Sequence, residues 1–312
     1  MHRLLGALCL TSAAAIWGGT YVVSKVVMEE IPPMTLVVIR YLIALVVLFV
    51  VLRAKGGDSI ARGDWGRLAR YGLVGYTLSI GTQFIGTHLS SAHMGAVITS
   101  ASPAVIALFA AWLLREKLTW RKGITLLVAT LGVLVVIGAD FQEGGGTLTG
   151  NLFLVVAALT WGLYSVQGKA LTERYSPLTV SYWATIFGVL FTLPLSAGEL
   201  AWRGLTVPTD PAVWWGVLFL GVVSTAVAFF LWAKGFALME ASTAALFFFV
   251  QPICGSLLGW WLLGERLNLS FLIGSLLIIG SVVFSMRGEQ QAVETSEIIS
   301  RTEGNASRFP NR

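Results

Sequence analysis

Charged residues are scarce in this sequence. Only 12% of its 312 residues are Asp, Glu, Lys or Arg, and 56% are hydrophobic, whereas soluble domains carry roughly 25% charged residues. The mean hydropathy is +0.78. A chain with so little polar surface is excluded from the water-soluble globular class.

Residues that bind metals or drive catalysis are also missing. The two cysteines, Cys9 and Cys254, both fall in apolar runs, so no disulfide or metal site is expected. No Gly-Lys-Ser/Thr phosphate loop is present, which argues against ATP hydrolysis by this chain. No Asp or Glu falls in the middle of an apolar run, so no acidic carrier of protons or sodium is evident. The sequence therefore predicts no catalytic residue, cofactor or metal, and it lacks the cluster that an integral-membrane enzyme would need.

Long apolar runs fill most of the chain. A membrane crossing needs about 20 mostly apolar residues, and ten runs qualify: 4–28, 34–52, 68–89, 94–114, 122–138, 150–171, 179–198, 212–235, 242–263 and 269–286. The first run resembles a signal peptide, but it continues to Val27 and its motif returns later, so we interpret it as a retained helix. The prediction is an all-α integral membrane protein with ten transmembrane helices and a disordered cytoplasmic tail, 289–312.

Lys and Arg in the loops predict the orientation. With the N-terminus in the cytoplasm, most of the loop cations lie on the cytoplasmic side, and only Lys25, Arg203 and Arg266 lie outside. Both termini are therefore expected in the cytoplasm. This bias also accounts for the net charge of +5, so the basic balance does not indicate nucleic-acid binding.

Two motifs occur twice, about half a chain apart. "AAAIWGGTYVVSK" at 13–25 returns as "AALTWGLYSVQGK" at 157–169, and the segment 90–118 aligns with 239–267, pairing Pro103 with Pro252. The chain is thus predicted to consist of two five-helix repeats, 1–144 and 145–288. Because five is odd, the second repeat enters the membrane inverted, which is a common plan of secondary transporters that bind substrate between the repeats.

These residues resemble the drug/metabolite transporter superfamily, in particular its ten-helix EamA-type members. The resemblance covers about residues 5–286 and rests on the Trp-Gly motifs, Arg40, the two prolines and "REKL"/"GERL" after helices 4 and 9. It implies a secondary transporter but leaves the substrate open, because relatives carry amino acids, nucleotide precursors or other metabolites.

Aromatic and amide side chains at mid-membrane depth are the first candidates for a substrate site. Trp17 and Trp161 lie near the centres of their helices, and Tyr21 and Tyr164 follow them on the same general faces. The alternative is that these rings only pack between helices. Gln251 precedes Pro252 at the centre of helix 9, and Gln83 and its repeat mate Trp232 lie about a turn from the midplane. These seven residues are predicted to bind substrate.

Arg40 is the eighth candidate, and it has two interpretations. It lies inside helix 2, where a charge is costly unless it faces protein or water. It could extend outward and pair with Glu29 or Glu30, or it could offer a bidentate fork to a substrate carboxylate.

Glu116, at a helix boundary, is expected to cap the helix that follows it. Helices 5 and 10 lack mid-span charges and motif aromatics. They are expected at the periphery, where a homodimer contact would form if the protein dimerises.

The sequence thus favours a transporter of a bacterial inner membrane. It is expected to export or exchange amino acids or related carboxylated metabolites by alternating access. Its expected partners are a small-molecule substrate and the lipid bilayer. A facilitator channel for small metabolites is the alternative, and an integral-membrane enzyme is a more distant one.

Overall fold

A computed structural model describes residues 2–90, 95, 98–137, 147–204, 207–263, 269 and 272–284, which contain helices and no strand. The first half holds α1 (His2–Val27), α2 (Pro33–Lys55), η1 (Arg62–Asp64), α3 (Trp65–Gly72), η2 (Leu73–Ile80), α4 (Gly81–Leu89), α6 (Ser102–Leu113) and α7 (Trp120–Ile137). The second half holds α8 (Leu148–Thr172), α9 (Pro177–Arg203), α10 (Pro211–Leu218), η4 (Phe219–Val227), α11 (Ala228–Leu238), α12 (Ala241–Ala244), η5 (Ala245–Phe249), α13 (Val250–Leu263) and a helix over Leu272–Phe284.

Five helical segments in the described part are long and apolar enough to cross a membrane. They are His2–Val27, Pro33–Lys55, Leu148–Thr172, Pro177–Arg203 and the continuous segment Pro211–Leu238. Three shorter apolar helices cover Ser102–Leu113, Ala241–Gly255 and Leu272–Phe284. The predicted tail 289–312 lies outside the described residues. The protein is therefore an all-helical, multi-pass membrane protein.

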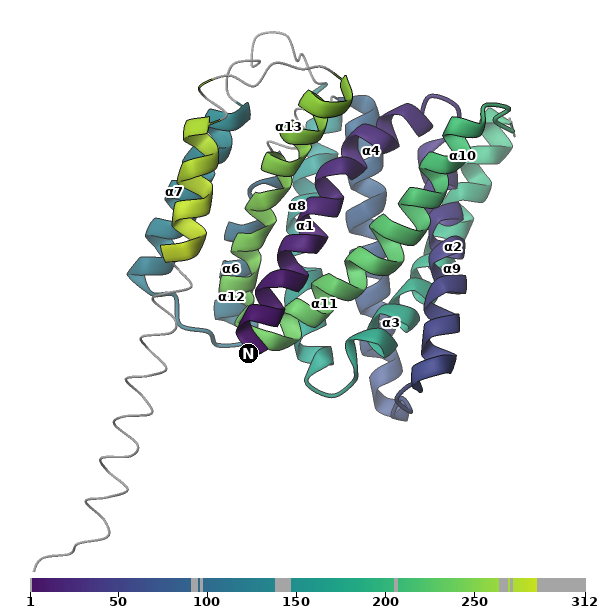
Figure 1. The fold of residues 1–312 in the computed structure, drawn as a ribbon. Helices are drawn as coiled ribbons and strands as arrows, with labels where there is room; N and C mark the ends of the chain where they lie inside the picture. The colour runs from purple at the N-terminus through teal and green to yellow at the C-terminus, as the bar shows by residue number, and fades with distance from the viewer. Residues whose placement is uncertain are drawn as a thin grey trace, which may run out of the picture.

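The helices stand side by side in one bundle, with the N-terminus of α1 at one end (Figure 1). Helix α7 and the helix Leu272–Phe284 lie together at one edge of the bundle. A side chain added at Gly132 of α7 would come within 2.9 Å of the carbonyl oxygen of Gly274, so the two helices touch closely at this point. The structure thus agrees with the expectation that helices 5 and 10 are peripheral.

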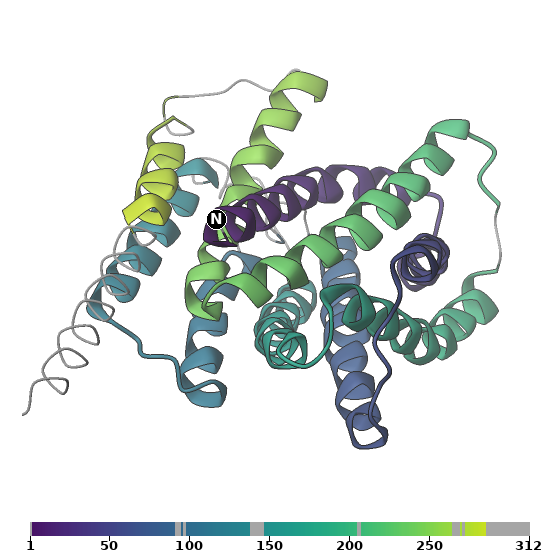
Figure 2. The same ribbon diagram turned by 60° about the horizontal axis from the view of Figure 1, so that its bottom comes forward.

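The two glycines of the repeated Trp-Gly motif each allow a long helix to pack closely against a shorter one. An added Cβ at Gly18 of α1 would lie 2.7 Å from the backbone oxygen of Gln251 in α13, and one at Gly162 of α8 would lie 2.5 Å from the Val105 side chain in α6. Helices α1 and α13 lie next to each other in Figure 1, and Figure 2 shows that they cross at an angle. Close packing through small residues is the usual means by which helices associate in membranes.

The helical backbone is irregular next to both repeated prolines and at two further places. Pro103 lies in the first turn of α6, directly after a turn at residues 100–101, and the 3₁₀ segment η5 precedes Pro252 in α13. In addition, η2 and η4 are π-helical without any proline, and they occupy corresponding positions in the two halves of the chain.

Candidate functional site

A cavity of about 40 Å³ lies at the centre of the bundle. Six of the eight predicted site residues line it: Trp17, Tyr21, Arg40, Gln83, Trp161 and Gln251. Ligand pockets for drug-sized molecules usually enclose roughly 300–1,000 Å³. In this conformation the cavity is therefore smaller than the pockets that enclose drug-sized molecules.

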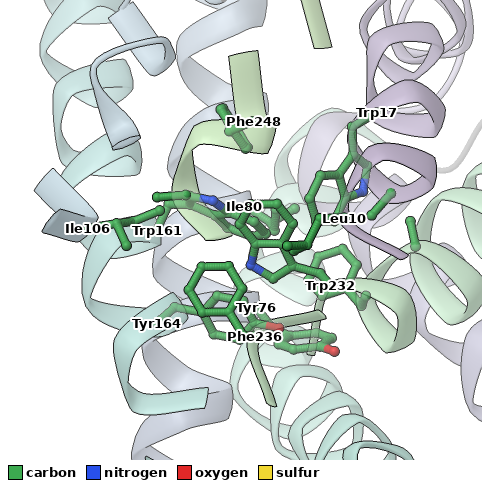
Figure 3. Packing of buried hydrophobic residues seen from close by; sticks show 14 of the residues in the cluster. Leu10, Trp17, Tyr76, Ile80, Ile106, Trp161, Tyr164, Trp232, Phe236 and Phe248 are labelled. Atoms are coloured by element: carbon green, nitrogen blue, oxygen red, sulfur yellow. The ribbon is translucent and has the colours of Figure 1, made fainter. Parts of the chain in front are cut away.

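The two copies of the repeated motif meet at this cavity. The rings of Trp17 and Trp161 contact edge to face, with centroids 5.1 Å apart, and Phe248 lies against both (Figure 3). The indole Nε1 of Trp17 donates a hydrogen bond to the carbonyl oxygen of Ser224 at 3.0 Å. The indole Nε1 of Trp161 is buried with no hydrogen-bond partner among the described residues. The two tryptophans thus differ: one is held by the backbone, and the other keeps a donor available.

Arg40 crosses from α2 into the cavity wall and is 1% exposed. Its Nε donates to Thr225 Oγ1 at 2.7 Å and its Nη2 donates to Ser224 Oγ at 3.1 Å, while the guanidinium lies 5.2 Å from the centroid of the Phe84 ring. No carboxylate among the described residues pairs with it. The outward orientation with an ion pair to Glu29 or Glu30 is therefore wrong.

The π-helical segment η4 places the two hydroxyl groups that hold Arg40. In η4, Thr225 Oγ1 also donates to the carbonyl oxygen of Leu220, five residues earlier, at 2.6 Å, and Ser224 Oγ shares a 2.8 Å hydrogen bond with Thr20 Oγ1. Such bulges are frequent at functional sites. Sequence reasoning missed Ser224 and Thr225, although two adjacent hydroxyl residues inside the apolar run 212–235 were a usable signal.

Other cavity-lining polar atoms also lack partners. Besides Trp161 Nε1, the amide Oε1 of Gln251 and the hydroxyl of Ser102 are buried without a hydrogen bond among the described residues. Buried polar groups in proteins are normally hydrogen-bonded, so each exception needs an explanation. The cavity is thus lined by an indole N–H donor, an amide oxygen acceptor, a hydroxyl group and the guanidinium of Arg40. Together these groups can recognise a polar ligand.

Tyr164 and Trp232, the other two predicted site residues, are not in the cavity lining. They lie behind it, in a layer that we call the aromatic wall: Tyr71, Tyr76, Tyr164, Phe229, Trp232 and Phe236. Tyr71 and Tyr164 stack with ring centroids 4.4 Å apart, and Trp232 Nε1 donates to Ser165 Oγ. Figure 3 shows Tyr76, Tyr164 and Phe236 below Trp17 and Phe248. Among these six, only Phe229 also lines the cavity.

The aromatic wall lies between the cavity and one end of the bundle. Along α8, Trp161 lines the cavity and Tyr164 follows it toward the end where Lys169 lies. We call this the basic end of the bundle, because Lys55, Arg67, Lys122, Lys169 and Arg174 lie at it. The cavity is thus separated from the basic end by a packed aromatic layer.

Carboxylates hold the two halves of the chain together at the basic end. Glu116 accepts hydrogen bonds from the backbone nitrogens of Ala241 and Ser242 and from the Ser242 hydroxyl. The expectation that Glu116 caps the following helix is therefore wrong. It caps α12 in the other half, because the loop after α6 lies against the N-terminus of α12.

Asp58, in the loop after α2, and Asp64, the last residue of η1, hold the residues that lead into α9. Asp58 accepts from the backbone nitrogen of Ser176, and hydrogen bonds from Ser176 hold the pKa of its carboxyl below the usual range. Asp64 accepts from the Tyr175 hydroxyl at 2.8 Å and from Arg174, and the Tyr175 hydrogen bond is the main reason that the pKa of Asp64 is also lowered.

A matching carboxylate lies at the opposite end of the same helix pair. Glu199, near the end of α9, accepts from the backbone nitrogen and the hydroxyl of Thr35 in the first turn of α2, at 2.9 and 3.0 Å. An acidic side chain at a helix N-terminus is favourable because of the helix dipole. The antiparallel pair α2 and α9 is thus fastened by a carboxylate at each end.

Comparisons with known proteins show which family and fold this chain resembles. The model of the EamA-like transporter family matches residues 4–138 and again 148–287. The uncharacterized transporter YetK of Bacillus subtilis (strain 168) is 30% identical over 297 residues, covering 93% of this chain and 90% of YetK. The uncharacterized inner membrane transporter YicL of Salmonella typhimurium (strain LT2) is 30% identical over 294 residues, covering 89% of this chain and 94% of YicL. A crystal structure of a protein that is 21% identical superposes with a TM-score of 0.77 over 93% of this chain and 99% of that one, which is a likeness of fold alone.

Proposed function

Because the chain belongs to the EamA-like transporter family, we propose that this membrane transporter binds small carboxylated metabolites, amino acids foremost, and exports or exchanges them by alternating access. The membrane is a bacterial inner membrane, with both termini in the cytoplasm. The carrying observation is Arg40, a buried cation in the cavity wall with hydroxyl partners and no carboxylate partner among the described residues.

The chemistry of Arg40 favours an anionic group on the substrate. A buried charge costs free energy unless it is paired, and removing the partner of a buried ion pair costs roughly 3–5 kcal/mol. Two neutral hydroxyls orient the guanidinium but do not neutralise it. A substrate carboxylate supplies both the charge and the geometry for a bidentate contact.

The unpartnered atoms suit the rest of such a molecule. The Oε1 of Gln251 can accept from an ammonium group, and the Nε1 of Trp161 can donate to a second oxygen. Rings of Trp17, Phe84, Phe229 and Phe248 offer apolar contact to a side chain. Arg40 has no counterpart in the second half, where Ala184 stands at the corresponding position. The site is therefore asymmetric, as its proposed substrate is.

We propose that ten helices form two inverted five-helix repeats around this site. The family model matching twice supports this, as do the π-helical segments η2 and η4 at corresponding positions. In the proposed cycle, the aromatic wall and the carboxylate contacts at the basic end close the cytoplasmic side. Release of those contacts, with closure at the other end, exposes the cavity to the cytoplasm.

The test begins with purified protein and a panel of amino acids, each paired with its carboxamide. We expect carboxylates to raise the melting temperature and amides to have little effect. Arg40→Lys keeps the charge but loses the planar fork, so it should weaken the carboxylate effect strongly. Equal effects of an acid and its amide on the wild-type protein would refute the carboxylate contact.

Transport is then measured in proteoliposomes by counterflow. A carrier working by alternating access accelerates uptake of labelled substrate when unlabelled substrate is present on the other side. Uptake without such trans-stimulation would instead indicate the facilitator channel.

A further inference from the structure

A second concave region lies on the flank of the bundle, away from the central cavity. It is a groove of about 580 Å³ between α2, the start of α9, and the η4–α11 segment. Figure 2 shows α2 nearly end-on, with α9 on one side and the segment containing α11 on the other. The walls are mostly apolar, from Val47, Val51, Leu178, Val227, Phe230 and Leu231. None of these residues contributes to the central cavity.

The groove is polarised along its length. Lys55 and Lys234 both line it, at the basic end of the bundle, together with Ser176 and Pro177. Lys234 Nζ lies 5.8 Å from the centroid of the Phe230 ring, which holds this amine over the groove wall. Among the residues that line the groove there is no acidic side chain. The nearby Asp58 is engaged with Ser176.

The apolar part extends from the lysines toward the middle of the membrane. Val47 precedes Lys55 by eight residues in α2, and Val227 precedes Lys234 by seven, which is about 10–12 Å at 1.5 Å per residue. Two cations at headgroup depth above a strip of aliphatic and aromatic side chains match the layout of a phospholipid. Basic pockets between membrane helices are known to bind anionic lipid headgroups.

We propose that this groove binds one anionic phospholipid of the leaflet at the basic end, with its phosphate between Lys55 and Lys234 and an acyl chain along Val51, Leu178 and Phe230. The lipid joins α2 and α9 to α11, three helices that move relative to one another if the two halves of the chain rock. The inference does not depend on the identity of the transported substrate.

The experiment titrates phosphatidylglycerol and, separately, phosphatidylcholine into detergent-solubilised protein and counts bound lipids by native mass spectrometry. The wild-type protein should retain one phosphatidylglycerol more tightly than the rest, and phosphatidylcholine should show no such site. A lysine near a membrane surface contributes about fivefold to binding of anionic lipid, so the double variant Lys55→Gln, Lys234→Gln should weaken that site about 30-fold.

The matched control is Arg62→Gln, Arg70→Gln. It removes the same charge from two exposed residues at the same end of the bundle that do not line the groove. This control should retain the tight lipid. Equal losses in both double variants would mean that the protein's net charge, and not the groove, attracts the lipid, and would overturn the proposal.

A third variant tests the acyl-chain part without changing charge. Val227→Trp places a larger side chain at a position that is 39% exposed in the groove, so the tight phosphatidylglycerol should be lost while both lysines remain. If the variant keeps its melting temperature and still binds the lipid as tightly as the wild-type protein, the groove is not the site.

Discussion

At the residue scale, the two tryptophans of the repeated motif make different contacts despite their matching positions. Trp17 contacts the rings of Trp161, Phe229, Trp232 and Phe248 and hydrogen-bonds to the backbone of η4. Trp161 packs on a similar set of rings, but its Nε1 has no partner among the described residues. At Trp161, a change that keeps an aromatic ring but removes the N–H group can therefore separate the effect of packing from the effect of a hydrogen bond to substrate.

We expect Trp161→Phe to keep the melting temperature nearly unchanged, because an aromatic ring still fills most of the space. Substrate-induced stabilisation should weaken, by about fivefold in affinity, since one hydrogen bond contributes about 1 kcal/mol. Trp17→Ala is the contrast, because truncating a large packed aromatic costs roughly 3–5 kcal/mol of stability. Thermal unfolding with and without substrate measures both. An unchanged substrate response in Trp161→Phe would leave its Nε1 without a role in binding.

The carboxylates at the basic end give the fold a pH dependence. The pKa of Asp64 is lowered in the folded protein, chiefly by the Tyr175 hydroxyl. A group with a lowered folded pKa stabilises the fold above its unfolded pKa, and this contribution is lost as the pH falls through the folded value.

We therefore expect the melting temperature to be flat near pH 7 and to fall once the pH drops below about 4, where unperturbed carboxyls take up protons. Asp64→Asn should lower the melting temperature at pH 7 and make the acid-side decline shallower. Because Arg67 and Arg174 are more than half exposed, the effect of their ion pairs is small. If Asp64→Asn left the pH profile unchanged, Asp64 would not contribute to it.

At the scale of elements, Gly18 determines how closely α1 approaches α13. Alanine is the better helix former by about 1 kcal/mol, so Gly18→Ala would stabilise α1 in isolation. In the bundle, its Cβ would meet backbone atoms of Gln251 and Gly255 at 2.7 and 2.8 Å. Backbone cannot move aside as a flexible side chain can, so the clash outweighs the gain in propensity.

We expect Gly18→Ala to cost about 1–3 kcal/mol, the usual range for overpacking, and to alter substrate binding because Gln251 lines the cavity. The control is Gly66→Ala in α3, where nothing lies within 4 Å of the added Cβ; it should leave stability unchanged or raise it. The measurement is the melting temperature of each variant in thermal unfolding, compared with that of the wild-type protein. Equal melting temperatures would show that α1 and α13 can separate without cost.

At the scale of the whole molecule, the Lys and Arg distribution is the basis for the proposed orientation of the bundle in the membrane. Arg62 in η1 lies at the basic end of the bundle. Thr209 lies just before α10, at the start of the spanning segment Pro211–Leu238, and therefore at the other end of the bundle. Both positions are exposed, so each is suited to chemical labelling.

In a background where Cys9 and Cys254 are replaced by alanine, Thr209→Cys should react with a membrane-impermeant maleimide added to intact cells. Arg62→Cys should react only after the membrane is permeabilised. The positive-inside rule gives the reason. If the two positions were labelled from the same side, the assignment of both termini to the cytoplasm and the inverted arrangement would have to be abandoned.

The sequence by itself determined the membrane class, the family and much of the lining of the central cavity. The length of an apolar run shows whether a helix can cross the membrane, and this depends only on the residues within the run. Polar residues in the middle of such a run stand out, because lipid offers their side chains no hydrogen-bond partner. Six of the eight candidates consequently line the cavity.

Only the tertiary structure decided what lies opposite each residue. It placed Tyr164 and Trp232 in the wall behind the cavity, gave Arg40 the hydroxyls of Ser224 and Thr225, and set Glu116 on α12 in the other half of the chain. The contacts of Arg40 and Glu116 join residues more than 100 positions apart. Such contacts depend on helix rotation and, at Arg40, on a π-helical segment that contains no proline. The spacing of residues along one helix determines which of them share a face. Which helix packs against that face is determined only when the whole bundle folds.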